Sequence, residues 1–296
     1  MADPRRRLST NVAGDFFVDE SCIDCDACRW IAPASFDAAG DRSRVFHQPT
    51  TPEETHRAEL ALIACPTASI GTTSPESKRS LADASRAFPD RVDANVHHCG
   101  YHAESSFGAA SWLIVRPDGN VLVDSPRFVP TLVKRIEEMG GVKTLFLTHR
   151  DDVADHAKFA EHFGCERVLH EADVDEGTRA VEHVVRGEEP VALAADLLVI
   201  PTPGHTAGSA CLLHHPETGE SHLFGGDHIA YSPELGHPYG FRGACWYRWS
   251  GVVKSMERLA KHRFEWILPG HGRPCHFEAD EMARQMKRCV EWARHA

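Results

Sequence analysis

The sequence has no long apolar run. No stretch approaches the roughly 18 consecutive apolar residues that a membrane helix needs, and the best candidate, residues 191–200, is interrupted by Asp196. Arg5, Arg6 and Arg7 make the start basic, but no apolar segment follows them, so we expect neither a signal peptide nor a twin-arginine export signal. These absences predict a cytoplasmic protein with no membrane partner.

An excess of positive charge is also missing. Lys and Arg number 32 against 43 Asp and Glu, and the formal net charge is −11. Proteins that bind nucleic acids usually carry a basic surface, because they neutralise phosphates with Lys and Arg. The composition therefore argues against a nucleic-acid partner.

Several catalytic motifs are absent. The chain contains no G-x-S-x-G, no P-loop, no H-E-x-x-H and no glycine fingerprint for a dinucleotide, so serine hydrolases, NTPases and Rossmann-type enzymes have no support. Cysteine and histidine are abundant instead, with 10 and 20 copies. Without an export signal, such cysteines are more often metal ligands or buried thiols than disulfides. Cysteine motifs come early and histidine motifs late, which suggests two modules with different metal chemistry.

The chain divides into three segments. Residues 11–72 hold four cysteines, residues 73–91 are rich in Ser, Pro, Ala and charge and are typical of a linker, and residues 92–296 alternate short apolar strands with amphipathic helices. We expect strands at Ser111–Val115, Asn120–Asp124, Thr144–Thr148, Leu197–Pro201, Ala210–Leu213, Ser221–Phe224 and Trp266–Leu268. We expect helices at Glu53–Ala64, Thr131–Met139, Asp155–Phe163, Ser250–His262 and Glu278–Ala296. This order predicts a layered α/β domain with helices covering sheet faces.

The early cysteines have the spacing of an iron–sulfur site. Cys22, Cys25 and Cys28 form a C-x2-C-x2-C run, and Cys65, followed by Pro66, lies far along the chain. A tight loop can hold three corners of a cluster and a distant segment the fourth, whereas structural zinc sites usually pair two C-x2-4-C knuckles. Four buried thiols without a metal are the remaining alternative.

This region resembles a single-cluster bacterial ferredoxin. The resemblance covers about residues 14–72 and includes the late Cys-Pro. It implies a small α+β ferredoxin-like domain in which Cys22, Cys25, Cys28 and Cys65 bind one [4Fe-4S] cluster. A redox partner protein for this domain would follow from that role.

Four later segments each end an apolar strand with a potential metal ligand. In chain order these ligands are His149, His205, Asp227 and His271. Functional residues are often found in loops at strand ends, because a rigid sheet positions them. The first loop, Thr148 to His156, concentrates further His and Asp side chains, which suit one or two divalent ions.

These motifs together resemble the metallo-β-lactamase superfamily, in particular its glyoxalase II-like hydrolases. The resemblance covers about residues 92–296 and implies an αββα sandwich. It implies that His149, Asp155, His156, His205, Asp227 and His271 hold one or two ions, zinc or iron, with Asp227 as the bridging residue.

The first loop departs from the family pattern H-x-H-x-D-H. It reads H-x-D-D-V-x-D-H, so that Asp151 replaces the middle histidine and two residues are added before Asp155 and His156. Two interpretations are open. Asp151 ligates in place of the histidine, as an acidic residue does in the flavodiiron relatives, or one metal position is weakened or lost.

The ligands predict a hydrolase. A bound divalent ion lowers the pKa of water from about 15.7 towards about 7, and the resulting metal-bound hydroxide would attack the carbonyl of a small ester, thioester or lactone. Asp155 or Asp152, if not a ligand, would orient the water or act as the base. The alternative is an iron-dependent oxidoreductase acting on O2, NO or a persulfide, with electrons supplied by the ferredoxin domain.

One further segment, Phe241–Trp249, is rich in aromatic residues and lies between the third and fourth ligand motifs. It is either a wall of the substrate pocket or ordinary core and helix cover.

Overall fold

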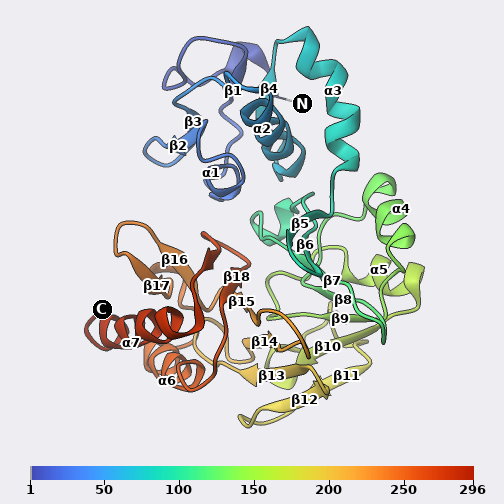
Figure 1. The fold of residues 1–296 in the computed structure, drawn as a ribbon, viewed down its shortest axis with the longest axis vertical. Coiled ribbons are helices and arrows are strands. Elements are labelled where there is room, and N and C mark those ends of the chain that lie inside the picture. Colours follow the sequence, from blue (N-terminus) through green and yellow to red (C-terminus); the bar gives the residue numbers. More distant parts are fainter. Residues whose placement is uncertain (1) are drawn as a thin grey trace. The chain divides into compact units, whose positions relative to one another are not determined.

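The computed structural model describes residues 2–296 (Figure 1). It divides into two compact units: the first is the chain up to Asn120 together with Ser125–Val142, and the second is Val121–Asp124 together with Lys143–Ala296. Among the described residues, the helices are all too short or too polar to cross a bilayer.

The first unit begins with two small antiparallel strand pairs and two helices. A 3-10 turn, η1 (Pro4–Arg6), precedes them. Strand β1 (Phe16–Val18) pairs with β4 (Ile70–Thr72), and β2 (Phe36–Ala38) pairs with β3 (Ser43–Val45). Helices α1 (Ala27–Ile31) and α2 (Pro52–Ala64) lie between these strands in the chain. Helix α2 begins at Pro52 because Thr51 caps it: the Thr51 side chain accepts from the Glu54 N–H and the Glu54 carboxylate accepts from the Thr51 N–H.

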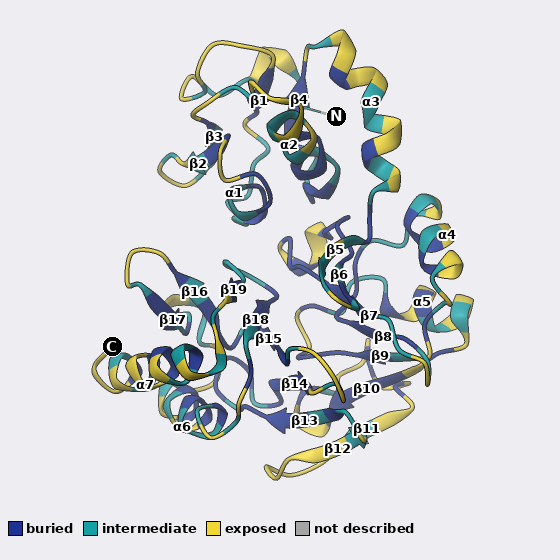
Figure 2. Cartoon of the chain, in the orientation of Figure 1, coloured by how far each residue is buried: buried dark blue, intermediate teal, exposed yellow. Residues whose placement is uncertain are grey.

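The rest of the first unit contains a long exposed helix and an antiparallel set of strands. Helix α3 (Pro75–Arg86) lies within the segment that we expect to be a linker, and Figure 2 shows that most of its surface is exposed. Strands β5 (Asp90–Asp93), β6 (Val96–His98) and β7 (Trp112–Ile114) pair in order, antiparallel. The 3-10 turn η2 (Glu104–Ser106) lies between β6 and β7, and helix α4 (Pro130–Glu138) completes the unit.

The second unit contains four parallel strands in the order β8, β9, β10, β11. These are β8 (Val121–Val123), β9 (Thr144–Phe146), β10 (Glu166–His170) and β11 (His183–Val185). Helix α5 (His156–Phe163) connects β9 to β10, as parallel pairing requires, and the 3-10 turn η3 (Glu171–Asp173) follows β10.

A second sheet in this unit has six strands in the order β12, β13, β14, β15, β18, β19. They span Val191–Ala194, Leu197–Pro201, Ala210–His214, His222–Gly226, Trp266–Pro269 and Cys275–His276. All pairs are antiparallel except β15 with β18. A small hairpin, β16 (Ala230–Ser232) with β17 (His237–Tyr239), and the 3-10 turn η4 (Arg242–Ala244) follow β15 in the chain.

Helices α6 (Trp249–Leu259) and α7 (Ala279–His295) cover this second sheet. Val252 and Met256 of α6 and Met282 and Met286 of α7 share a buried cluster with sheet residues such as Ile267. Figure 2 shows both helices buried along one side and exposed along the other, as expected for amphipathic helices on a sheet.

The seven expected strands and five expected helices are all present, with ends that differ by at most three residues. The elements that the pattern did not predict include short strands such as β16, β17 and β19, which have two or three residues each, but also the five-residue strand β10 and the twelve-residue helix α3. Strands of two or three residues are too short to show a period in the sequence.

Candidate metal centres

The four predicted cluster ligands surround one small pocket in the first unit. Cys22, Cys25, Cys28 and Cys65 line it together with apolar and small side chains that include Ile23 and Pro66. Cys22 and Cys25 lie in the loop that leads into α1, Cys28 lies in the first turn of α1, and Cys65 follows the end of α2.

The backbone of the cysteine loop is shaped to approach an anionic group. Asp24 and Asp26 both have a left-handed conformation, with φ of 63° and 64°. Left-handed residues between ordinary ones turn successive N–H groups to one side of the loop, and such concave loops are common at iron–sulfur sites. Arg29 forms ion pairs with both aspartates, which compensates much of their charge.

The thiols fit a group larger than one ion. All four are free cysteines, although they line one pocket. A zinc ion with four thiolates at about 2.3 Å would bring the sulfur atoms within about 4 Å of one another. Among the described residues, the groups of three ligand atoms within 4.8 Å consist of His and Asp alone. Burial raises the pKa of the Cys25 thiol to about 12, so a positively charged group is needed to hold it as the thiolate.

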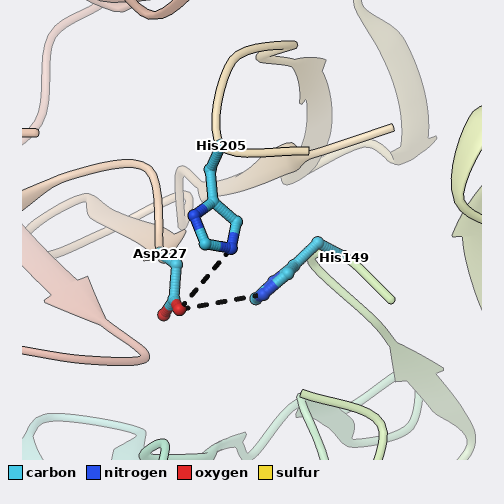
Figure 3. Close-up of side chains that lie close together, drawn as sticks. All are labelled: His149, His205 and Asp227. Atoms are coloured by element: carbon cyan, nitrogen blue, oxygen red, sulfur yellow. Dashed lines mark ion pairs between the residues drawn. The ribbon is translucent and has the colours of Figure 1, made fainter. Parts of the chain in front are cut away.

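The second unit brings two sets of ligand atoms together. His149, His205 and Asp227 form one set, and Asp152, Asp227 and His271 form the other, each with ligand atoms within 4.8 Å. Figure 3 shows the first set, with both imidazoles pointing toward the Asp227 carboxylate from separate loops. The loops follow β9, β13 and β15, as the strand-end motifs predict.

Asp227 lies between the two sets. Its Oδ2 is 3.8 Å from His149 Nε2 and 3.7 Å from His205 Nε2, while its Oδ1 is 2.7 Å from His271 Nδ1. Burial disfavours the charged carboxylate and so raises the pKa of Asp227. The nearby imidazoles of His271 and His149 have the larger opposite effect, and the pKa of Asp227 lies below its usual range. One carboxylate oxygen thus faces each set, the geometry of a bridging ligand.

Hydrogen bonds orient both histidines of the first set so that each could bind a metal ion. The Thr148 hydroxyl donates to the Asp124 carboxylate, so the Nδ1–H of His149 donates to Thr148 Oγ1 at 3.0 Å. The Nδ1–H of His205 donates to the carbonyl of Ala244 at 2.5 Å. Each Nε2 therefore carries a lone pair, and both Nε2 atoms are buried without a hydrogen-bond partner. Burial lowers the pKa of His149 to about 4, which keeps it neutral and ready to ligate.

The second set contains a buried pair of carboxylates. Asp152 is 1% exposed and its Oδ2 has no hydrogen-bond partner. Burial, with the neighbouring Asp227 and Asp124, raises the pKa of Asp152 well above its usual range. A divalent cation would relieve this repulsion. A Cβ at Gly270 would lie 2.7 Å from Asp152 Oδ2 and 2.9 Å from Asp227 Oδ1, so only glycine leaves room here.

The acidic residues of the altered first loop, Thr148 to His156, lie in different surroundings. Asp151 lies at the first set, with its Oδ2 3.5 Å from His205 Nε2 and 3.9 Å from His149 Nε2. Asp155 is the residue before α5 and pairs with Lys158 at 2.7 Å. His156 begins α5, where its Nδ1 lies 3.4 Å from Arg167. The structure thus brings Asp151 and Asp152 to the ligand sets, whereas Asp155 and His156 have these other partners.

Two buried aspartates that the motifs did not single out support the ligand loops. Asp124 accepts the N–H and the hydroxyl of Thr148, directly before His149. Asp173 accepts the N–H of Arg150, the hydroxyl of Thr206 and the N–H of Gly208, and so ties the first two ligand loops together. Nothing in their spacing could have shown these roles, because both act through the three-dimensional contact of distant loops.

The aromatic segment lies against the same centre. The N–H groups of Trp246 and Tyr247 both donate to the carbonyl of His205. The Trp246 ring is 63% exposed, and its centroid is 6.2 Å from that of His205. An exposed indole beside a ligand favours the pocket-wall interpretation of this segment.

Comparison with known proteins covers both parts of the chain. Residues 18–72 match the family model described as the 4Fe-4S single cluster domain of Ferredoxin I. The structure resembles VMB-1, with a TM-score of 0.53 and 16% identity over 70% of this chain and 95% of that chain. It also resembles the DIM-1 metallo-β-lactamase, with a TM-score of 0.52 and 18% identity over the same shares. The ferredoxin-like resemblance and the metallo-β-lactamase-type fold are therefore confirmed.

Curated relatives are hydroxyacylglutathione hydrolases. The enzyme of Xanthomonas campestris pv. campestris is 32% identical over 119 residues, which is 39% of this chain and 44% of that enzyme. The enzyme of Citrobacter koseri is 27% identical over 154 residues, 51% of this chain and 54% of that enzyme. The chain thus spans about half the length of the curated relatives that it matches.

Proposed function

We propose that the chain is a metal-dependent hydrolase of an ester, thioester or lactone that also carries a [4Fe-4S] cluster. The observation that carries this proposal is the pair of ligand sets that share Asp227, with two unpartnered histidine Nε2 atoms in the first set. The partial identity to hydroxyacylglutathione hydrolases supports a thioester as the first substrate class to test.

The first set would hold an ion through His149, His205, Asp151 and Asp227, and the second set a further ion through Asp152, Asp227 and His271. Such ions supply Lewis acidity for a carbonyl oxygen and acidify water. Asp155 and His156 are left out of this proposed ligand set because Asp155 pairs with Lys158 and His156 lies against Arg167.

The protein side chains contribute orientation and exclusion of water. Asp124 and Asp173 hold the ligand loops, and the buried imidazoles of His149 and His205 keep solvent from the rear of the site. Asp151 is 46% exposed and is the carboxylate that a substrate would meet first. Trp246 would form one wall for the acyl group.

A second candidate function is an iron-dependent oxidoreductase. Asp151 adds a carboxylate beside two histidines, and a set of two histidines and one carboxylate is characteristic of non-haem Fe(II) sites. The iron–sulfur domain would deliver the electrons. In this case the substrate would be O2, NO or a persulfide.

Metal and sulfide analysis of anaerobically purified protein separates the two functions. Full cluster iron and sulfide with one or two zinc ions, together with thioester or lactone turnover, would support the hydrolase. Iron beyond the cluster, negligible zinc and no hydrolysis would contradict it and favour the oxidoreductase.

The matched pair of variants is Asp152→Asn and Asp155→Asn. We expect the first to reduce turnover by about 100-fold, as the loss of a charged metal ligand would, and the second to leave turnover within about twofold, since an exposed ion pair contributes little. Equal losses in both variants would contradict the proposed ligand set.

We further propose that residues 11–72 form the cluster domain, 73–91 the connection and 92–296 the hydrolase domain. A redox protein would be the partner of the cluster domain, and the cytoplasm its compartment. Limited proteolysis within 73–91 followed by iron analysis of each fragment tests this division, and loss of all iron from the N-terminal fragment would contradict it.

A further inference from the structure

A chain of hydroxyl groups connects a cluster ligand to a buried carboxylate. Thr67 Oγ1 lies 3.8 Å from Cys65 Sγ and 2.5 Å from Ser69 Oγ. Ser69 Oγ lies 2.8 Å from Ser21 Oγ, which donates to Asp19 Oδ1 at 2.5 Å. Asp19 is 3% exposed and Ser69 is 1% exposed, whereas Ser21 and Thr67 are half-buried.

Asp19 acts as an acceptor. Its Oδ1 also accepts the N–H of Ser21 at 2.9 Å, and its Oδ2 accepts the N–H of Asp3 at 2.8 Å. Backbone N–H groups can only donate. Three donors on two oxygens are the pattern of a carboxylate.

The direction of each hydrogen bond in this series of hydroxyls follows from the Asp19 end. The single proton of the Ser21 hydroxyl is committed to Asp19, so Ser69 must donate to Ser21. Thr67 must then donate to Ser69. Each hydroxyl has one proton, so Thr67 has none left for Cys65. The close approach of Thr67 to the sulfur is therefore made by an oxygen lone pair.

We propose that Asp19, acting through Ser21, Ser69 and Thr67, withholds a hydrogen bond from the Cys65 thiolate and so keeps the reduction potential of the cluster low. A donor at a ligand sulfur stabilises the more negative, reduced cluster, and hydrogen bonds to sulfur are one of the factors that set the potential. Asp19 and the hydroxyl residues are positioning residues, since only Thr67 lies near the sulfur.

The other hydrogen bonds to Cys65 and Cys22 come from backbone donors, while the Ser43 side chain hydrogen-bonds the Cys28 sulfur. The N–H of Ser69 donates to Cys65 at 3.2 Å and the N–H of Ser43 donates to Cys22 at 3.4 Å. Backbone donors cannot reverse, whereas a hydroxyl can. The hydroxyl chain is thus a means to change the environment of Cys65 without moving the backbone. This inference does not depend on the proposed hydrolase function.

The test is a cycle of variants on the full chain with its cluster reconstituted, read by the midpoint potential in a spectroelectrochemical titration. Ser21→Ala removes the acceptor of Ser69 without changing any charge, so Ser69 and then Thr67 are free to turn toward the sulfur. We expect the equilibrium constant for cluster reduction to rise about tenfold, which for one electron is about 59 mV. Thr67→Val alone should leave the potential unchanged, and Ser21→Ala with Thr67→Val should return it to the wild-type value.

Two controls separate this effect from general disturbance. Ser21→Thr keeps a hydroxyl and should retain the wild-type potential. Thr73→Val removes a hydroxyl that donates to Asp15, and in the Ser21→Ala background it should leave the raised potential in place. The proposal is overturned if Ser21→Ala has the wild-type potential, or if Thr67→Val alone lowers the equilibrium constant for cluster reduction about tenfold, which is about 59 mV for one electron. Cluster iron and far-UV circular dichroism of each variant verify that it is folded and loaded.

Discussion

The two candidate metal centres of this chain are built in opposite ways. The cysteine site has three proposed ligands in seven consecutive residues and a fourth, Cys65, at the end of one helix. The histidine and aspartate site takes its ligands from loops that follow separate strands, and orients them through buried partners such as Asp124 and Asp173. The first centre depends on a loop conformation and the second on the sheets, so they should respond differently to substitution and to pH.

The largest effect should come from breaking the cysteine loop. Cys25→Ser should abolish the cluster, because one corner of the cluster loses its thiolate, while the ions of the second unit remain. Cys165→Ala removes a buried thiol elsewhere and should keep both centres. Metal and sulfide analysis of both variants checks this, and loss of every ion from Cys25→Ser would show that the centres are not independent.

The corresponding change in the other centre is Gly270→Ala. The new methyl group would meet the carboxylate oxygens of Asp152 and Asp227 at 2.7 and 2.9 Å, so we expect at least about a 100-fold loss of affinity at the second set. Gly243 has open space around its Cα, and Gly243→Ala is the matched control. Equilibrium dialysis against a chelator measures the metal affinity of both variants. Equal affinities would mean that the loop around Gly270 shifts to make room for the methyl group.

The pH dependence should separate the centres further. Burial raises the pKa of Cys25 to about 12, so a proton must leave when the cluster binds, and assembly should strengthen about tenfold per pH unit for each displaced proton between pH 6 and 8. Burial lowers the pKa of His149 to about 4, so in that range His149 has no proton to displace.

At the second set, the raised pKa of Asp152 means that a proton must leave, so binding there should also strengthen as pH rises. Reconstitution and ion binding in buffers of matched ionic strength provide the comparison. If the affinity of the first ligand set for its ion rises with pH as steeply as cluster assembly does, the assignment of a neutral His149 is wrong.

The smallest effect should come from losing the hydrogen bond that orients the His149 ring. Thr148→Val removes the acceptor of the His149 Nδ1–H and frees the ring to adopt the other tautomer, so we expect about a 10-fold loss of affinity at the first set. Thr148→Ser keeps the hydroxyl and should bind as the wild type does. Isothermal titration measures both, and equal affinity of the two variants would remove the role assigned to Thr148.

Much of this organisation could be predicted from local patterns. The strands at Leu197–Pro201 and Trp266–Pro269 are continuous apolar runs, and most of their residues are buried. The helix at Ala279–His295 has a helical period, and its apolar residues Met282 and Met286 are buried accordingly. Helix α3 shows the limit, since its segment is typical of a linker by composition although Ser74 caps a regular helix there. A helix as polar as α3 has few apolar residues from which a pattern can be recognised.

The sequence by itself determined which chemistry each part could support. The spacing of Cys22, Cys25 and Cys28 limits how far apart three thiols can lie, and strand-end positions direct His149, His205, Asp227 and His271 to loops. Only the tertiary structure decided which acidic residues of the first loop reach the centre. Asp151 and Asp152 do, whereas Asp155 and His156 begin a helix, because contacts from Asp124 and Asp173, and not spacing, set the direction of that loop. The order of donors between Asp19 and Cys65 was likewise settled by packing, since residues far apart in the chain meet there.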